Sequence, residues 1–87
     1  MGHMRIHYFA AARAATEVSD EPTEGFDSLG ELLDDAAARH TGRTDSGLSL
    51  ADILERCTFL VDGQRAERAT GLAGAQRVDV LPPFAGG

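Results

Sequence analysis

The sequence predicts an α+β fold in a single small domain. Segments with alternating apolar residues stand near both ends of the chain, and the clearest amphipathic helix lies between them. The 87 residues are 43% hydrophobic and 25% charged, which is ordinary for one folded domain with a modest core. We expect the domain to span residues 4–81, followed by a protruding tail at 82–87. Residues 1–3 are interpreted as an expression remnant.

The first quarter of the chain predicts two antiparallel strands. Met4–Phe9 alternates well enough to form the first strand. Ala10–Ala15 has high helix propensity and is expected to form about one helical turn. Thr16–Ser19 is expected to be the returning strand, and Asp20–Gly25, which contains a proline and a glycine, a polar turn.

The main helix is expected to begin after Ser28. Ser28 and Glu31 have the spacing of a capping box, in which each side chain satisfies a free backbone N–H. Gly42 is the expected stop. The apolar face carries Leu29, Leu32, Leu33, Ala36 and Ala37. Asp34 and Asp35 could suggest a metal or acid–base site, but adjacent helical residues point about 100° apart, so we expect a solvated surface.

The middle of the chain predicts a loop, a short helix and a buried strand. Gly42–Gly47 is a polar loop, and Ser49–Glu55 repeats the capping signal before a second, short helix. Cys57–Val61 is apolar on both faces, which is typical of a central strand that is covered on both sides.

The last third of the domain predicts a short strand and a final strand. Asp62-Gly63 is a turn dipeptide that leads to a short return at 64–66. Residues 67–76 are expected to be a connection, with Leu72 in the core. Val78 and Val80 alternate with a polar residue and indicate the last strand.

Composition excludes several classes of function. The net charge of −6 argues against nucleic acid and anionic membranes and favours an electropositive protein partner. Cys57 is the single cysteine, so the chain has no internal disulfide, and we expect a small buried core residue rather than a nucleophile. All eight basic residues are arginine, so no lysine is available for Schiff-base chemistry. No apolar run approaches the roughly 20 residues of a membrane span, and we expect a soluble, cytoplasmic protein.

The last six residues have the properties of a substrate. Pro82 and Pro83 cannot continue a strand and hold a stiff, extended spacer that directs the chain end outward. Gly86 and Gly87 have no side chains and can enter a channel too narrow for other residues. A terminal carboxylate becomes electrophilic only when a partner converts it to a mixed anhydride. The pattern therefore predicts a protein that is acted upon.

The run Leu81-Pro82-Pro83-Phe84-Ala85-Gly86-Gly87 resembles the C-terminus of the MoaD/ThiS family of ubiquitin-like sulfur carriers, above all the small subunits of molybdopterin synthases. The resemblance extends over nearly the whole chain from Met4, although Gly74-Ala75-Gln76 and Asp62-Gly63 depart from the turn residues common in the family. It implies a β-grasp fold, in which a mixed sheet packs on one main helix and the first and last strands are neighbours.

The resemblance also implies a chemistry for Gly87. Its carboxylate would be adenylated with ATP by an E1-like activating enzyme and converted to a thiocarboxylate, with a sulfurtransferase as the sulfur source. The tail would then enter the large subunit of molybdopterin synthase, in a heterotetramer, with Phe84 as an anchor and Ala85 and Gly86 giving clearance. The chain itself would bind no cofactor and no metal, and catalytic side chains would belong to the partners.

Three other functions remain open. A sulfur carrier for thiamin or cysteine biosynthesis shares the same chain end and chemistry. A ubiquitin-like protein modifier would form isopeptide bonds through Gly87 with lysines of other proteins. An interaction module would carry the two glycines incidentally, and its activity would survive removal of the tail.

Overall fold

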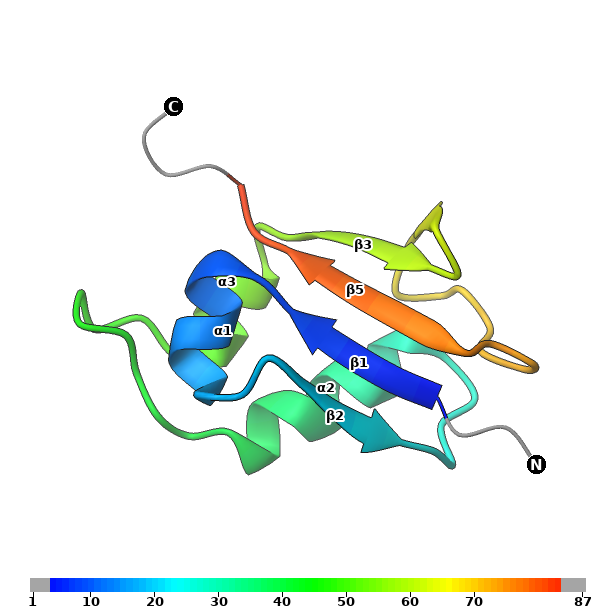
Figure 1. The fold of residues 1–87 in the computed structure, drawn as a ribbon, viewed down its shortest axis with the longest axis horizontal. Helices are drawn as coiled ribbons and strands as arrows, with labels where there is room; N and C mark the ends of the chain where they lie inside the picture. Colours follow the sequence, from blue (N-terminus) through cyan, green and yellow to red (C-terminus); the bar gives the residue numbers. More distant parts are fainter. Residues whose placement is uncertain (1–3, 84–87) are drawn as a thin grey trace.

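The structure, a computed structural model, describes residues 4–83. In chain order the elements are β1 (Met4–Tyr8), α1 (Ala10–Thr16), β2 (Asp20–Thr23), α2 (Leu29–Arg39), α3 (Leu50–Leu54), β3 (Thr58–Val61), β4 (Gln64–Ala66) and β5 (Arg77–Leu81) (Figure 1). The predicted α+β class is confirmed, because the strands form one sheet that packs on a main helix, α2.

The sheet has the strand order β2-β1-β5-β3-β4. Its middle strand is β5, which pairs in parallel with β1 and antiparallel with β3. The expectation that the first and last strands are neighbours is therefore confirmed. The prediction that residues 57–61 form the central strand is wrong, since β5 lies between β1 and β3 and takes that place.

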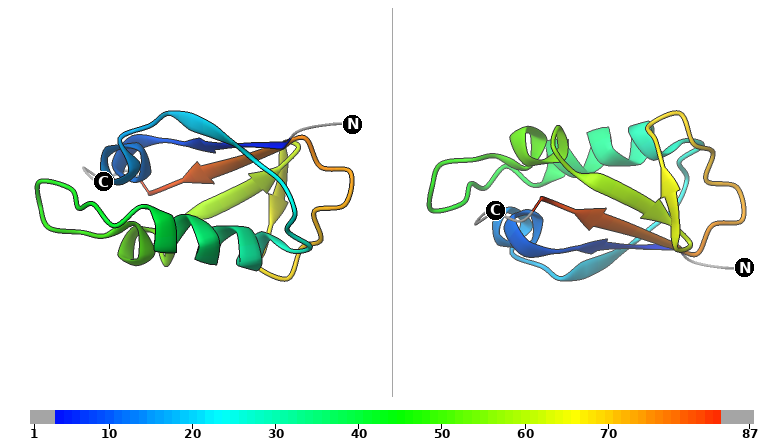
Figure 2. Two further views of the ribbon diagram at one scale, coloured as in Figure 1. Left: turned by 90° about the horizontal axis from the view of Figure 1, so that it is seen from below. Right: turned by 90° about the horizontal axis from the view of Figure 1, so that it is seen from above.

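The helices lie on one side of the sheet. Figure 2 shows α2 and α3 along the same face, with α1 at the end of the sheet toward which β5 runs. The opposite face exposes Arg5, Thr58 and Arg65 and leaves Leu60 half-buried, so β3 is covered on one face only and not on both. No helix described between residues 4 and 83 is long and apolar enough to span a bilayer. The fully buried side chains include Ile6, Leu29, Leu32, Leu33, Leu50, Val78 and Val80.

The main helix begins where the sequence predicts. The Ser28 hydroxyl accepts a hydrogen bond from the Glu31 backbone N–H at 3.3 Å. The helix ends at Arg39, and His40 follows it in an extended conformation, so the prediction of Gly42 as the stop is wrong. The physical reason is a tertiary contact, because the His40 ring is held 2.7 Å from the carboxylate of Glu21 on β2.

The returning strand lies four residues later than predicted. Helix α1 runs to Thr16, and Glu17 ends it with a left-handed φ of 62°. Residues 16–19 therefore form the helix end and its connection to β2, and the predicted turn at 20–25 instead contains the strand. Pro22 is tolerated there because β2 is an edge strand, which needs hydrogen bonds along one side only.

Candidate functional site

The end of β5 leads directly into Pro82 and Pro83, the two predicted site residues that the structure describes. Leu81 pairs with Thr58 of β3, and the Phe9 N–H donates to the Val80 carbonyl at 3.2 Å. Pro82 has no N–H, and the strand ends before it, as the sequence predicts. Leu81 and Pro82 are half-buried and Pro83 is exposed. The chain thus leaves the middle of the sheet, with a strand on either side.

The structure places only part of the predicted tail. Pro82 and Pro83 are described, whereas Phe84, Ala85, Gly86 and Gly87 lie outside the described residues. The division into a domain at 4–81 and a tail at 82–87, and the roles expected for the last four residues, therefore stay predictions.

The start of β5 is fastened by the turn after β3. The Asp62 carboxylate accepts hydrogen bonds from the backbone N–H groups of Gln76 (3.0 Å) and Arg77 (2.9 Å). The backbone N–H of Asp62 donates to the Arg77 carbonyl at 2.8 Å. Asp62 and Gly63 have φ angles of 49° and 82°, the left-handed pair that an Asp-Gly hairpin turn requires. The sequence indicates the turn, but not that the aspartate also positions the strand leading to the tail.

Replacing Asp62 should loosen this attachment. Asp62→Ala removes the acceptor and puts a residue with a Cβ and no local hydrogen bond at a positive φ, so we expect a loss of about 1–3 kcal/mol in the free energy of unfolding. Asp62→Asn keeps an acceptor oxygen and tolerates the left-handed conformation, so its loss should be smaller. Urea unfolding of the two variants measures the difference, and equal losses would contradict the role given to the carboxylate.

A groove adjoins the two prolines. It has a volume of about 550 Å³ and is lined from three parts of the chain: Ala11 in α1, residues of the segment 48–56 including α3, and Pro82 with Pro83. Sequence reasoning missed it, because these segments are far apart in the chain and only the fold brings them together.

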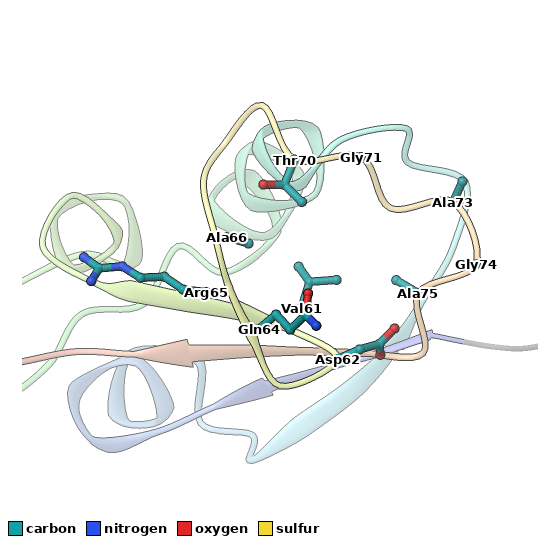
Figure 3. A pocket seen from close by; sticks show the side chains of 10 residues that line it. All are labelled: Val61, Asp62, Gln64, Arg65, Ala66, Thr70, Gly71, Ala73, Gly74 and Ala75. Atoms are coloured by element: carbon teal, nitrogen blue, oxygen red, sulfur yellow. The ribbon is translucent and has the colours of Figure 1, made fainter.

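A second cavity lies between β4 and the loop before β5 (Figure 3). It has a volume of about 400 Å³, and small residues of the segment 71–75 form much of its wall. The Asp62 carboxylate accepts hydrogen bonds from backbone N–H groups at the start of β5. The Thr70 hydroxyl accepts a hydrogen bond from the Glu67 N–H at 2.9 Å. Figure 3 shows the Arg65 side chain extending away from the loop. Asp62 and Thr70 therefore make hydrogen bonds that hold the loop in shape.

Cys57 has the character of a structural thiol. It is half-buried at the edge of the core, just before β3, and its thiol donates to the Ile53 carbonyl at 3.2 Å. Burial raises its pKa to about 11, so the reactive thiolate is scarce at neutral pH. It was expected to be a small buried residue, and it is in fact only partly covered.

A charged cluster that the sequence did not indicate surrounds Glu21 of β2. Its carboxylate accepts from the Tyr8 hydroxyl at 2.6 Å and from two nitrogens of Arg39 at 2.9 and 3.3 Å, and it contacts the His40 ring at 2.7 Å. Partial burial opposes ionisation, but the hydrogen bonds from Arg39, Tyr8 and His40 outweigh it and lower the pKa of Glu21 to about 2. Burial, followed by the contact with Glu21, raises the pKa of Tyr8. The cluster joins β2 to the end of α2 and holds its carboxylate ionised, which suits a structural role.

The Glu21 cluster should make stability depend on pH. The pKa of Glu21 falls from 4.5 to about 2 on folding. The contribution of Glu21 to the free energy of unfolding is therefore complete above about pH 4.5 and is lost as the pH falls toward 2. Urea unfolding from pH 7 to pH 2 should show a smaller loss in Glu21→Gln than in the wild type. Hydrogen bonds from Arg5 and Ser49 also lower the pKa values of Asp20 and Asp52, so the variant must be compared with the wild type at each pH. Parallel curves would contradict this role.

Each of the paired aspartates of α2 contacts a different arginine. Asp34 makes an ion pair with Arg68, and Asp35 with Arg39 at 2.6 Å. Among residues 4–83, no group of three or more His, Cys, Asp and Glu side chains is arranged to hold a metal. The expectation of a solvated helix surface at this position agrees with the exposed Asp34 and half-buried Asp35.

Comparison with protein families identifies the family to which this chain belongs. The model of the ThiS family matches residues 6–87, which includes both the sheet and the last residues of the chain. The chain belongs to the ThiS family. For this ThiS-family chain the resemblance to the MoaD/ThiS sulfur carriers is thus confirmed. A comparison with curated protein sequences found no match.

Solved structures confirm the β-grasp fold of this ThiS-family chain. SAMP1 from Haloferax volcanii is 22% identical with a TM-score of 0.74, covering 99% of this chain and all of that one. A second structure, of the H. volcanii small archaeal modifier protein 1, is 19% identical with a TM-score of 0.67, covering 97% of this chain and all of that one. A molybdopterin converting factor subunit 1 from Pyrococcus furiosus is 17% identical with a TM-score of 0.66 and the same coverage.

Proposed function

We propose that this protein is a sulfur carrier for the biosynthesis of molybdopterin. The Gly87 carboxylate attacks the α-phosphate of ATP on an activating enzyme, pyrophosphate leaves, and a mixed anhydride with AMP forms. Sulfur delivered at the sulfide oxidation level from a sulfurtransferase then attacks the carbonyl carbon of this anhydride, the bond to AMP breaks, and the chain ends in a thiocarboxylate. That group donates its sulfur in the active site of a partner. In this proposal the protein acts in the cytoplasm.

The proposal rests on the residues at the end of the chain, together with the family to which the chain belongs. The run from Leu81 to Gly87 follows the central strand of a ThiS-family β-grasp domain, and it ends in two glycines after a Pro-Pro spacer. In the described part of the chain, the clusters around Glu21 and Asp62 serve the fold, and burial of Cys57 disfavours its thiolate. This distribution supports a protein whose reactive group is its last carboxylate.

The proposal assigns three partners. They are an E1-like activating enzyme, a sulfurtransferase, and the large subunit of molybdopterin synthase, which would take up the tail in a heterotetramer. A net charge of −6 favours partners with positive surfaces. The two prolines reduce the conformational entropy that the tail loses on docking, and Phe84 would be its anchor.

A ubiquitin-like modifier is the second candidate, and a specific observation favours it. Two of the similar structures are SAMP1 and small archaeal modifier protein 1. This function would use the same adenylate but transfer the Gly87 acyl group to a lysine amine of another protein. The chain has no lysine of its own, so it would modify other proteins without building lysine-linked chains on itself.

Supplying the thiocarboxylated chain to candidate acceptors tests the pathway. A molybdopterin synthase large subunit with its pterin precursor should consume the thiocarboxylate and return the carboxylate, whereas a thiazole-forming or cysteine-forming enzyme should leave it intact. Consumption only by the latter enzymes would move the assignment to thiamin or cysteine biosynthesis. Stable conjugates with protein lysines, in place of sulfur transfer, would support the modifier.

A further inference from the structure

The groove beside the two prolines has a single cation, Arg56, among its described lining residues. Arg56 is exposed and follows α3, where its backbone N–H donates to the Ile53 carbonyl at 3.0 Å. Hydrogen bonds from Ser49 lower the pKa of Asp52 in the same groove, and the nearby charge of Arg56 adds to this effect. The fold therefore fixes a positive charge close to the start of the tail.

The rest of the tail is long enough for the chain end to reach Arg56. Four residues follow Pro83, and a chain of four residues spans at most about 14 Å. Pro83 and Arg56 line one groove of about 550 Å³, so the Gly87 carboxyl group has the Arg56 side chain within its range. A group tethered in this way meets the chain end at an effective concentration on the order of millimolar.

The described residues that line the groove offer no group that traps an activated acyl chain. Besides Arg56 they are aliphatic residues, the two prolines and the carboxylates of Asp52 and Glu55, and none carries an amine, hydroxyl, thiol or imidazole. A carboxylate that attacks the acyl group forms an anhydride, which is itself still activated. The neighbouring thiol of Cys57 lines a different cavity, and burial raises its pKa to about 11.

Arginine and lysine differ in their reactivity toward an activated carboxyl group. The lysine amine has a pKa of about 10.4, so a small neutral fraction exists near neutral pH. Its lone pair attacks the carbonyl carbon of an adenylate, the bond to AMP breaks, an amide forms and the amine proton passes to solvent. The arginine guanidinium stays protonated and offers no free lone pair for this attack. All eight basic residues of this chain are arginine.

We propose that Arg56 determines the specificity of the activated chain end. It supplies a positive charge within reach of Gly87 in a form that cannot accept the acyl group, so the acyl group is left for the partner's nucleophile. The inference rests on the proposed function and adds to it a residue that prevents self-acylation. It applies to sulfur transfer and to protein modification alike, because both pass through the adenylate.

Aminolysis of a C-terminal thioester tests this inference without an activating enzyme. The chain is prepared with Gly87 as an alkyl thioester, and its intact mass is followed in mildly alkaline buffer for the wild type, Arg56→Lys and Arg5→Lys. A cyclised chain is lighter than the free acid by one water, and tandem mass spectrometry locates the new amide. We expect Arg56→Lys to cyclise through position 56 about tenfold or more faster than the other two chains, at a rate independent of protein concentration.

Arg5→Lys is the matched control, because it places an equally exposed amine beyond the range of the tail. Arg5 lies beside Arg77 in the sheet, and six residues separate Arg77 from Pro83, which is roughly 20 Å along an extended chain. Equal rates of cyclisation in the two variants would refute the role of Arg56.

The function on which the inference rests is tested separately, by pyrophosphate release from ATP with an activating enzyme and the wild-type chain. If the wild type is adenylated and Arg56→Lys does not cyclise faster than Arg5→Lys, only the inference fails. If no activating enzyme adenylates the wild type, the proposed function fails, and the role of Arg56 fails with it even where the thioester cyclises.

Discussion

Deletion of Gly87 is expected to abolish sulfur transfer without changing the fold. The truncated chain still ends in a glycine carboxylate, but that carboxylate stands one residue short of the point where the partner performs its chemistry. A displacement of even 1 Å from a reactive geometry can cost about a hundredfold in rate, and one residue spans roughly 3.5 Å. Sulfur transfer is measured with the activating enzyme, the sulfur source and the acceptor present in excess.

Adding one alanine after Gly87 provides the matched control for length. It leaves the wild-type residues in place and moves the carboxylate in the opposite direction, so it should be equally inactive. Both variants should unfold within about 0.5 kcal/mol of the wild type, because both changes lie beyond β5 and leave every residue of the described core unchanged. Sulfur transfer by either variant at the wild-type rate would contradict the role of Gly87.

Gly86→Val should have the second-largest effect on function. A β-branched side chain widens the chain next to the reactive carboxylate and restricts its backbone, where the proposal requires passage through a narrow channel. We expect kcat/KM for adenylation to fall by about a hundredfold or more, with an unchanged free energy of unfolding. Pyrophosphate release at varied carrier concentrations measures it.

Ala85→Val serves as the comparison for Gly86→Val. It adds a branched side chain to the same tail, one residue further from the carboxylate and at a position that already carries a Cβ. Its effect should be clearly smaller. Equal effects of the two substitutions would show that bulk in the tail, and not clearance at Gly86, is what matters.

The strongest local patterns in the sequence predicted their elements correctly. The apolar period after Ser28 produces α2, because four of the five residues that it assigns to one face are buried. Val78 and Val80 are fully buried and Pro82 follows the end of β5, as alternation and proline chemistry predict. The tail, which is the core of the functional assignment, was found from the sequence, while the structure describes only its first two residues.

Tertiary contacts explain where local patterns failed. Thr16 and Val18 have β-forming side chains, yet α1 extends to Thr16 and the strand starts at Asp20. Pro22 indicated a turn because the sequence does not reveal that its strand lies at an edge of the sheet. The Glu21 cluster joins residues 13 to 19 positions apart, and the groove joins segments still further apart, so neither leaves a signal in a short window.

Intact mass of the purified protein tests the central claim most directly. The chain is incubated with ATP, a sulfur source and an activating enzyme that is known to act on another carrier of the family. The variant that lacks Gly87 is treated in parallel. The account predicts that one oxygen at the C-terminus is replaced by sulfur in the wild type alone. An unchanged mass with each activating enzyme tried, or the same exchange in the truncated chain, would contradict the assignment of Gly87 as the sulfur-carrying residue.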